Sequence, residues 1–233
     1  RELIEQSIAQ HRDRPCFTCM DRTLTYGDLD VLANRFAAYL QQVARLRKGD
    51  RIALMLPNVL QYPVAILGAF RAGLTIVNTN PMYTPRELQH QLHDSGARAI
   101  LILENFAHTL AEVQHDVHLD TMIVTGVGDL LAFPKSLLVN FVLRHVKKQV
   151  PEYSLPGAVS LTEALSKGRY ENLERVELEH EDIAFLQYTG GTTGVSKGAT
   201  LTHRNLVANV LQMEAWVQPA LVDTSRGPVP EQL

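Results

Sequence analysis

The sequence predicts an α/β fold in which largely parallel sheets are flanked by helices. Short apolar runs alternate with helical patterns over the first 125 residues, which is the pattern of βαβ units. Hydrophobic residues make up 45% and charged residues 20% of the 233 residues, so the composition is globular and excludes a disordered or collagen-like chain. The length suits one large domain or two small ones, each able to bury a core.

The individual elements follow from apolar periodicity and from residues that start or stop helices. Thr25 can cap a helix over 26–43, whose apolar stripe comprises Leu29, Leu32, Ala33, Phe36, Ala37 and Leu40. Thr84-Pro85-Arg86-Glu87 is a capping box with proline in the first helical position, and Gly96 ends the helix that it starts. After the first helix we expect strands over 51–56, 74–77, 99–103 and 121–124, with helices over 63–72, 85–95 and 107–113 between them.

The charge balance gives no reason to expect a nucleic-acid partner. Lys and Arg number 22 against 25 Asp and Glu, a net charge of −3, and we find no basic stripe studded with aromatic residues. The longest nearly apolar run, 137–143, is far below the ~18 residues that a membrane span needs. The two cysteines, Cys16 and Cys19, cannot make a disulfide scaffold, so we expect a reducing, cytoplasmic compartment.

The strand–helix alternation breaks between Gly126 and Gly157. Apolar residues are concentrated over 130–146, and they end among four basic residues, Arg144, His145, Lys147 and Lys148. We favour a core helix with a basic last turn, because cations suit that end of the helix dipole. The alternative is a helix that lies on an anionic bilayer surface with its apolar side inserted.

A glycine-rich segment between two expected strands, 183–188 and 199–201, carries the chemistry. Four glycines in the nine positions 190–198 let backbone N–H groups turn toward one anion without Cβ clashes. The hydroxyls of Thr189, Thr192 and Thr193 add donors, and Lys197 adds a mobile positive charge. We therefore expect a polyphosphate ligand here rather than a plain surface loop, and a helix over 203–213 capped by Thr202 beyond it.

Spacing excludes two well-known phosphate motifs. The Walker pattern needs Gly-Lys-Ser/Thr, whereas Lys197 stands between Ser196 and Gly198. The dinucleotide fingerprint needs Gly-x-Gly-x-x-Gly, and no two of these glycines lie two positions apart. Neither a P-loop NTPase nor a Rossmann dehydrogenase is supported.

The run Tyr188-Thr-Gly-Gly-Thr-Thr-Gly-Val-Ser-Lys-Gly-Ala199 resembles the AMP-binding signature of the acyl-adenylate-forming enzymes. Residues 24–29 and 70–81 are similar to two earlier motifs of that family. The likeness is strongest to bacterial long-chain fatty-acid–CoA ligases, and the residues that carry it are 56–65, 81–88, 185–188 and 201–205. The resemblance covers essentially the whole chain and implies the N-terminal part of the acyl-adenylate-forming fold.

The resemblance implies ATP-dependent activation of a long-chain fatty acid to acyl-AMP and then to acyl-CoA, with release of pyrophosphate and AMP. It implies ATP, Mg²⁺ and coenzyme A as cofactor and co-substrates. It also places nucleotide binding on Tyr188, Thr189, Gly190, Gly191, Thr192, Thr193, Gly194, Val195, Ser196, Lys197, Gly198 and Ala199. The family's acid–base, ribose and magnesium motifs come later than Leu233, so no catalytic or metal residue is assigned in this chain.

We accordingly expect an incomplete N-terminal adenylation domain, inactive by itself. Its parts would be a βα sheet layer over 1–125, an apolar and basic insertion over 126–157 and the phosphate-loop segment over 158–233. The expected partners are small molecules, with a homodimer and peripheral contact at the inner face of the cell membrane through 130–148 left open. An adenylating enzyme for an aryl or amino acid, or an isolated nucleotide-binding or interaction module, are the alternatives.

Three weaker signals are interpreted as structural or left open. Cys16 and Cys19 have the C-x-x-C spacing, but no second cysteine pair exists to complete a zinc site. The pairs His90/His93 and His115/His118 lie three apart on expected helices, and we favour solvated helix faces over metal binding. His203 either approaches the nucleotide or is an ordinary first-turn histidine.

Overall fold

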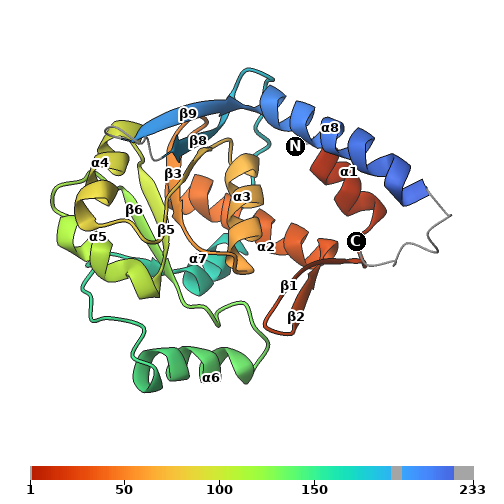
Figure 1. Cartoon of the computed structure of the whole chain (residues 1–233). Coiled ribbons are helices and arrows are strands. Elements are labelled where there is room, and N and C mark those ends of the chain that lie inside the picture. Colours follow the sequence, from red (N-terminus) through yellow and green to blue (C-terminus); the bar gives the residue numbers. More distant parts are fainter. Residues whose placement is uncertain (1, 190–195, 223–233) are drawn as a thin grey trace.

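The computed structural model describes residues 2–189 and 196–222, and a seven-stranded sheet is its centre (Figure 1). The strand order is β7-β6-β5-β3-β4-β8-β9, in which every neighbouring pair is parallel except β8 and β9. The α/β class with a largely parallel sheet is confirmed. The strands are β3 (Arg51–Met55), β4 (Thr75–Asn78), β5 (Ala99–Leu103), β6 (Thr121–Thr125), β7 (Val159–Ser160), β8 (Ile183–Thr189) and β9 (Lys197–Thr202).

Helices cover both faces of this sheet (Figure 1). Side chains of a strand alternate between the two faces. Ile52 and Leu54 therefore pack in one core cluster with α2, α3 and α7, whereas Ala53 and Met55 pack in a second cluster with α4 and α5. The α-helices are α1 (Glu2–Gln10), α2 (Tyr26–Ala38), α3 (Gln61–Arg71), α4 (Pro85–Ser95), α5 (Ala107–Val113), α6 (Lys135–Phe141), α7 (Leu161–Gly168) and α8 (His203–Val222).

Short non-α turns extend or precede three of the helices. A π-turn, η1 (Tyr39–Val43), continues α2, so that the two together end where the apolar stripe predicted. A 3-10 turn, η2 (Glu104–Phe106), precedes α5, and a second π-turn, η3 (Val142–Val146), continues α6. A separate hairpin of β1 (Pro15–Cys19) and β2 (Arg22–Thr25) lies beside α2, and it carries both cysteines as free thiols.

Capping chemistry set the helix boundaries as predicted. The Thr84 hydroxyl accepts from the Glu87 N–H while the Glu87 carboxylate accepts from the Thr84 N–H, and Gly96 ends α4 with a φ of 59°. The same reciprocal pair joins Thr25 and Asp28 at the start of α2. One boundary was wrong: α8 was expected to end near residue 213 but runs to Val222, because neither glycine nor proline occurs over 203–218 to stop it there.

The expectation of a core helix within 126–157 was wrong. No residue of α6 or η3 is buried, and Phe133, Leu137, Leu138 and Phe141 are all more than half exposed. The reason is position: α6 lies at the edge of the molecule, outside the layers that cover the sheet (Figure 1). Within the described part of the chain, no helix is both long and apolar enough to cross a bilayer.

Candidate functional site

Strands β8 and β9 form the hairpin that frames the glycine-rich segment. Tyr188 is paired with Gly198 and Thr189 with Lys197, so the segment leaves the sheet at the carboxyl end of β8. Thr189, Lys197 and Ala199 are exposed, and Ser196 is half-buried. The other predicted phosphate-site residues lie outside the described residues: Gly190, Gly191, Thr192, Thr193, Gly194 and Val195.

Tyr188 fixes the first strand of this hairpin. It is 8% exposed, and its phenol donates a hydrogen bond to Asp94 Oδ2 at 2.5 Å. Burial, followed by the hydrogen bond to the Asp94 carboxylate, raises the pKa of Tyr188 far above its ordinary range, so the phenol stays protonated. A Cβ on Gly198 would lie 3.0 Å from the Tyr188 ring, which explains a glycine at that position.

Helix α4 also reaches Ser196, the residue just before the second strand. The carbonyl oxygen of Ser196 lies 3.4 Å from His90 Nε2, and His90 is four residues before Asp94 on the same helix face. Neither role was predicted from the sequence, where the spacing of His90 and His93 favoured a solvated helix face. The capping box fixes the helical phase of 85–95, but nothing local to it indicates which strand that face meets.

A cavity of about 240 Å³ opens beside the hairpin at the carboxyl ends of β3, β4 and β8. Ligands of open α/β sheets bind at this edge. Asn78 joins two of its walls, because it donates to Gln187 Oε1 at 2.8 Å and accepts from the Tyr62 hydroxyl at 2.9 Å. The full lining is uncharged: Leu54, Leu56, Tyr62, Asn78, Thr79, Asn80, Tyr83, Gln187 and Tyr188. It suits a neutral polar group or an apolar one more than a phosphate.

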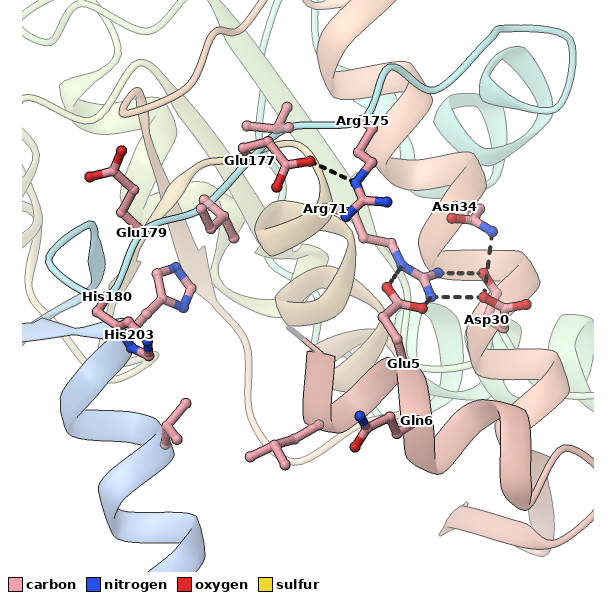
Figure 2. A pocket seen from close by; sticks show the side chains of 14 residues that line it. Glu5, Gln6, Asp30, Asn34, Arg71, Arg175, Glu177, Glu179, His180 and His203 are labelled. Carbon is pink, nitrogen blue, oxygen red and sulfur yellow. Dashed lines mark hydrogen bonds and ion pairs between the residues drawn. The ribbon is translucent and has the colours of Figure 1, made fainter.

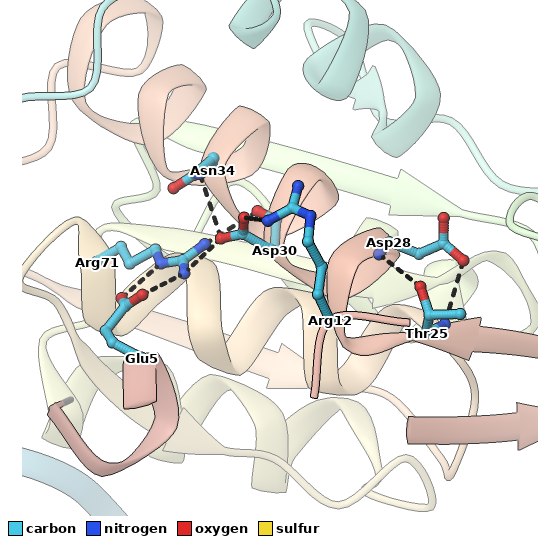
Figure 3. Close-up of polar contacts among 7 residues, drawn as sticks. All are labelled: Glu5, Arg12, Thr25, Asp28, Asp30, Asn34 and Arg71. Carbon is cyan, nitrogen blue, oxygen red and sulfur yellow. Dashed lines mark hydrogen bonds and ion pairs between the residues drawn. The ribbon is translucent and has the colours of Figure 1, made fainter. Parts of the chain in front are cut away.

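A larger cavity of about 680 Å³ lies away from the hairpin, between α1, α2, residues 175–180 and α8 (Figure 2). Arg71 is its central charge, and it is 2% exposed. Its guanidinium donates to both Glu5 oxygens, at 3.0 and 2.8 Å, and to Asp30 Oδ1 at 2.8 Å (Figures 2 and 3). Because these charges are already paired with one another, the arrangement is structural.

His203 lies at the edge of that cavity. It is 8% exposed and packs edge-on against the ring of Phe70 at 5.0 Å. Burial lowers its pKa, so the neutral imidazole is favoured. In the described ranges, no group of three or more His, Cys, Asp and Glu side chains is arranged to hold a metal ion.

Comparison with known proteins identifies the family of this chain. Residues 4–228 match the family model described as AMP-binding enzyme. The chain belongs to the AMP-binding enzyme family. Its glycine-rich hairpin, anchored on α4, therefore lies in an AMP-binding domain, and the resemblance seen in the sequence is confirmed.

Within the AMP-binding enzymes, bacterial fatty-acid ligases are close relatives. The chain is 53% identical over 220 residues to a long-chain-fatty-acid–CoA ligase of Escherichia coli O157:H7, covering 94% of this chain and 39% of the relative. It is 34% identical over 222 residues to the ligase of that name in Bacillus subtilis strain 168, covering 93% and 39%. The chain thus spans about two fifths of the length of these curated relatives.

Solved structures agree with the fold. The crystal structure of a long-chain-fatty-acid–CoA ligase from Archaeoglobus fulgidus superposes with a TM-score of 0.69 at 26% identity, covering 91% of this chain and 38% of that one. An anthranilate–CoA ligase in complex with anthranoyl-AMP gives 0.70 at 19% identity, covering 87% and 34%, and shows the fold alone.

Proposed function

We propose that the full-length protein activates a long-chain fatty acid with ATP. The acid would be converted to acyl-AMP with release of pyrophosphate, and the thiol of coenzyme A would then displace AMP to give acyl-CoA. One observation carries this proposal: 53% identity over 220 residues to a protein named long-chain-fatty-acid–CoA ligase. The described hairpin supports it, since it holds the glycine-rich segment at the ligand-binding edge of the sheet.

In this proposal the segment 189–197 binds the β- and γ-phosphates of ATP. Negative charge grows on the leaving pyrophosphate as the carboxylate attacks the α-phosphate, so donors fixed in advance lower the barrier. Thr189, Thr192 and Thr193 would donate hydroxyls, and Lys197 would bring a full positive charge from the exposed start of β9. Tyr188, Gly198 and Ala199 would shape the base of the segment.

The residues that the structure describes do not fit a resident Mg²⁺. Magnesium takes oxygen ligands, usually one or two carboxylates with substrate phosphates. Every residue lining the cavity beside the hairpin is uncharged, and no metal-holding cluster occurs in the described parts of the chain. No step of the proposed reaction is therefore derived through the metal.

We also propose the three-part division of an incomplete adenylation domain: a βα layer over 1–125, an insertion over 126–157 and the phosphate-loop segment over 158–233. The sheet draws strands β3–β6 from the first part and β7–β9 from the third. The full-length protein would act in the cytoplasm and contact the inner face of the cell membrane through 130–148.

Pyrophosphate exchange with the full-length protein tests the role of the segment. Lys197→Ala and Thr192→Ala should each slow fatty-acid-dependent ATP–pyrophosphate exchange by about 100-fold, the usual effect of removing one fixed transition-state donor. Thioester formation from supplied acyl-AMP should change much less. Lys167→Ala, which removes a half-exposed lysine that pairs with Glu163 on α7, is the matched control. Wild-type exchange in both variants would refute the assigned role.

Two alternatives predict different results. An enzyme for another carboxylic acid would show exchange with an aryl or amino acid and none with a long-chain fatty acid. An isolated nucleotide-binding module would bind ATP tightly with residues 1–233 alone, as measured by calorimetry. We expect weak or no binding, because the family's ribose and adenine contacts are expected beyond Leu233.

A further inference from the structure

The helix formed by α6 and η3 exposes apolar side chains on one side and is fastened to the protein by the other. Phe133, Leu137, Leu138 and Phe141 are 79%, 64%, 62% and 57% exposed. We call these four residues the apolar face. Leu137 and Leu138 precede Phe141 by four and three positions, so all three lie on one side of the helix. Clustered exposed side chains of this size mark interaction sites in soluble domains.

Polar contacts fix the inner side of the helix. Asn140 donates to Asp129 Oδ1 at 2.8 Å and accepts from the Gly128 N–H at 2.7 Å. The other Asp129 oxygen accepts from the Gly126 N–H at 2.8 Å and from the Thr125 hydroxyl at 2.9 Å, at the end of β6. A Cβ on Gly128 would lie 2.5 Å from the Ser136 carbonyl oxygen, so glycine allows this close approach.

Two ion pairs fasten the ends of the helix. Lys135 Nζ lies 2.9 Å from Asp21 in the β1–β2 turn, and Arg144 pairs with Glu104, whose side chain is 8% exposed. Val139 packs against the main core from the inner side. With its ends and inner side held, the helix cannot turn its apolar face inward without breaking these contacts.

The segment that carries the apolar face contains charges of one sign, although its Lys135 and Arg144 are paired with Asp21 and Glu104 from elsewhere in the chain. Residues 130–151 contain Lys135, Arg144, Lys147 and Lys148 and no Asp or Glu, although the whole chain carries a net charge of −3. Lys147 and Lys148 are exposed just after the helix, and His145 stacks against Phe141 at 5.0 Å between ring centres. An apolar strip edged by lysines is complementary to a surface that is anionic outside and apolar beneath.

We propose that the apolar face of α6 inserts into an anionic lipid bilayer while Lys147 and Lys148 bind its headgroups. This inference rests on the proposed function in one respect. A long-chain fatty acid partitions into bilayers, so a ligase bound to a bilayer would lie close to its substrate. The geometry agrees, because β6 and β8 are parallel members of one sheet, so the insertion and the phosphate segment both leave its carboxyl edge. Figure 1 shows α6 projecting from the body, where a flat surface can reach it.

Vesicle flotation of the full-length protein, without ATP, fatty acid or coenzyme A, tests the proposal. Wild-type protein should float with vesicles of phosphatidylglycerol and phosphatidylcholine in equal parts, and at least tenfold less with phosphatidylcholine alone. Leu138→Ser/Phe141→Ser should lower binding at least tenfold. Lys147→Glu/Lys148→Glu should lower binding to the anionic vesicles by more than tenfold and abolish its salt dependence.

A control variant shows whether vesicle binding belongs to the apolar face. Met82→Ser/Tyr170→Ser removes two side chains of similar exposure, 78% and 80%, elsewhere on the surface and should float like wild type. Equal flotation of the Leu138→Ser/Phe141→Ser and wild-type proteins would overturn the proposal. So would a dimer, detected by light scattering without vesicles, that this variant converts to monomers, since a second copy would then cover the face.

Activity distinguishes failure of this inference from failure of the proposed function. With detergent-dispersed fatty acid, pyrophosphate exchange by Leu138→Ser/Phe141→Ser should equal that of wild type, because the apolar face (133–141) is not part of the segment 189–197 that is proposed to bind ATP. If the wild-type protein bound vesicles but showed no exchange, the ligase proposal would be refuted and the proposed lipid-binding surface would stand. If it showed exchange but bound no vesicles, the lipid-binding surface would be refuted and the ligase proposal would stand.

Discussion

The phenol of Tyr188 and the carboxylate of Asp94 are joined by a 2.5 Å hydrogen bond that links the end of β8 to α4. His90, one turn earlier on α4, lies 3.4 Å from the carbonyl oxygen of Ser196, near the end of the glycine-rich segment. One helix thus contacts the residue just before the segment 189–197 and a residue near the end of that segment. Asp94 and His90 act as positioning residues in the proposed function, because they hold its two ends.

Tyr188→Phe should loosen this attachment without unfolding the domain. The loss of a hydrogen bond to a charged acceptor costs about 1.5–3 kcal/mol of unfolding free energy. Pyrophosphate exchange should fall about tenfold, because the strand end from which the phosphate segment starts is no longer held in place. Urea unfolding and exchange measure the two effects, with Tyr170→Phe, at 80% exposure, as the matched control.

A double-mutant cycle of Tyr188→Phe and Asp94→Ala measures how much of the effect on exchange comes from the hydrogen bond between these two residues. If the hydrogen bond carries the effect, Tyr188→Phe/Asp94→Ala should be little worse than either single variant. Additive losses in exchange would contradict the positioning role. Asp13→Asn changes an exposed acid that lies remote from the β8–β9 hairpin, and it should leave exchange unchanged.

The Arg71 ion pairs predict a stability difference between two arginines that share one partner (Figure 3). Arg71 is 2% exposed between Glu5 and Asp30, whereas the Arg12 side chain is 58% exposed and forms a single ion pair with Asp30, at 3.3 Å. Arg71→Ala should cost about 3–5 kcal/mol, since it leaves carboxylates without their buried partner. Arg12→Ala should cost less than about 1 kcal/mol.

Urea midpoints with unchanged slopes would measure both arginine variants. Arg71→Met keeps the volume but not the charge. It should be as destabilised as Arg71→Ala if the charge matters, and close to wild type if only packing does. Equal effects of Arg12→Ala and Arg71→Ala would contradict the importance of burial.

The sequence predicted what local chemistry decides. The helix cap at Thr25, the capping box at Thr84 and the apolar strands around Ile52 and Ile100 are self-contained signals, and each was confirmed in place. Which side of a helix meets a given strand is decided by tertiary packing, which local sequence patterns do not encode. His90 and Asp94 were therefore missed, and the apolar run around Leu138 was wrongly expected to be buried, since periodicity alone shows an apolar side but not what covers it.

The close packing of α7 on α2 predicts a large effect of one methyl group. A Cβ on Gly168 would lie 1.9 Å from the Arg35 carbonyl oxygen, and a backbone atom cannot move aside cheaply. Gly168→Ala should cost about 2–3 kcal/mol, as overpacking does. Gly157→Ala is the control: its φ of 81° is strained, but nothing lies within 4 Å, so about 1 kcal/mol is expected. Equal urea midpoints for the two variants would contradict the close approach.

His203 should make the stability of the domain depend on pH. Burial lowers its pKa, while the Asp182 carboxylate, paired with Lys48 at 2.6 Å, raises that pKa by a smaller amount. The unfolded chain therefore binds the proton more tightly than the folded one. The resulting stability is fully present above the unfolded pKa of about 6.5 and is lost as pH falls through the lower folded value. Urea unfolding from about pH 8 to about pH 5 should show that His203→Gln loses less stability on acidification than wild type does. His118→Gln, at an exposed position, should follow wild type, and the same acid loss in all three proteins would show that other groups cause it.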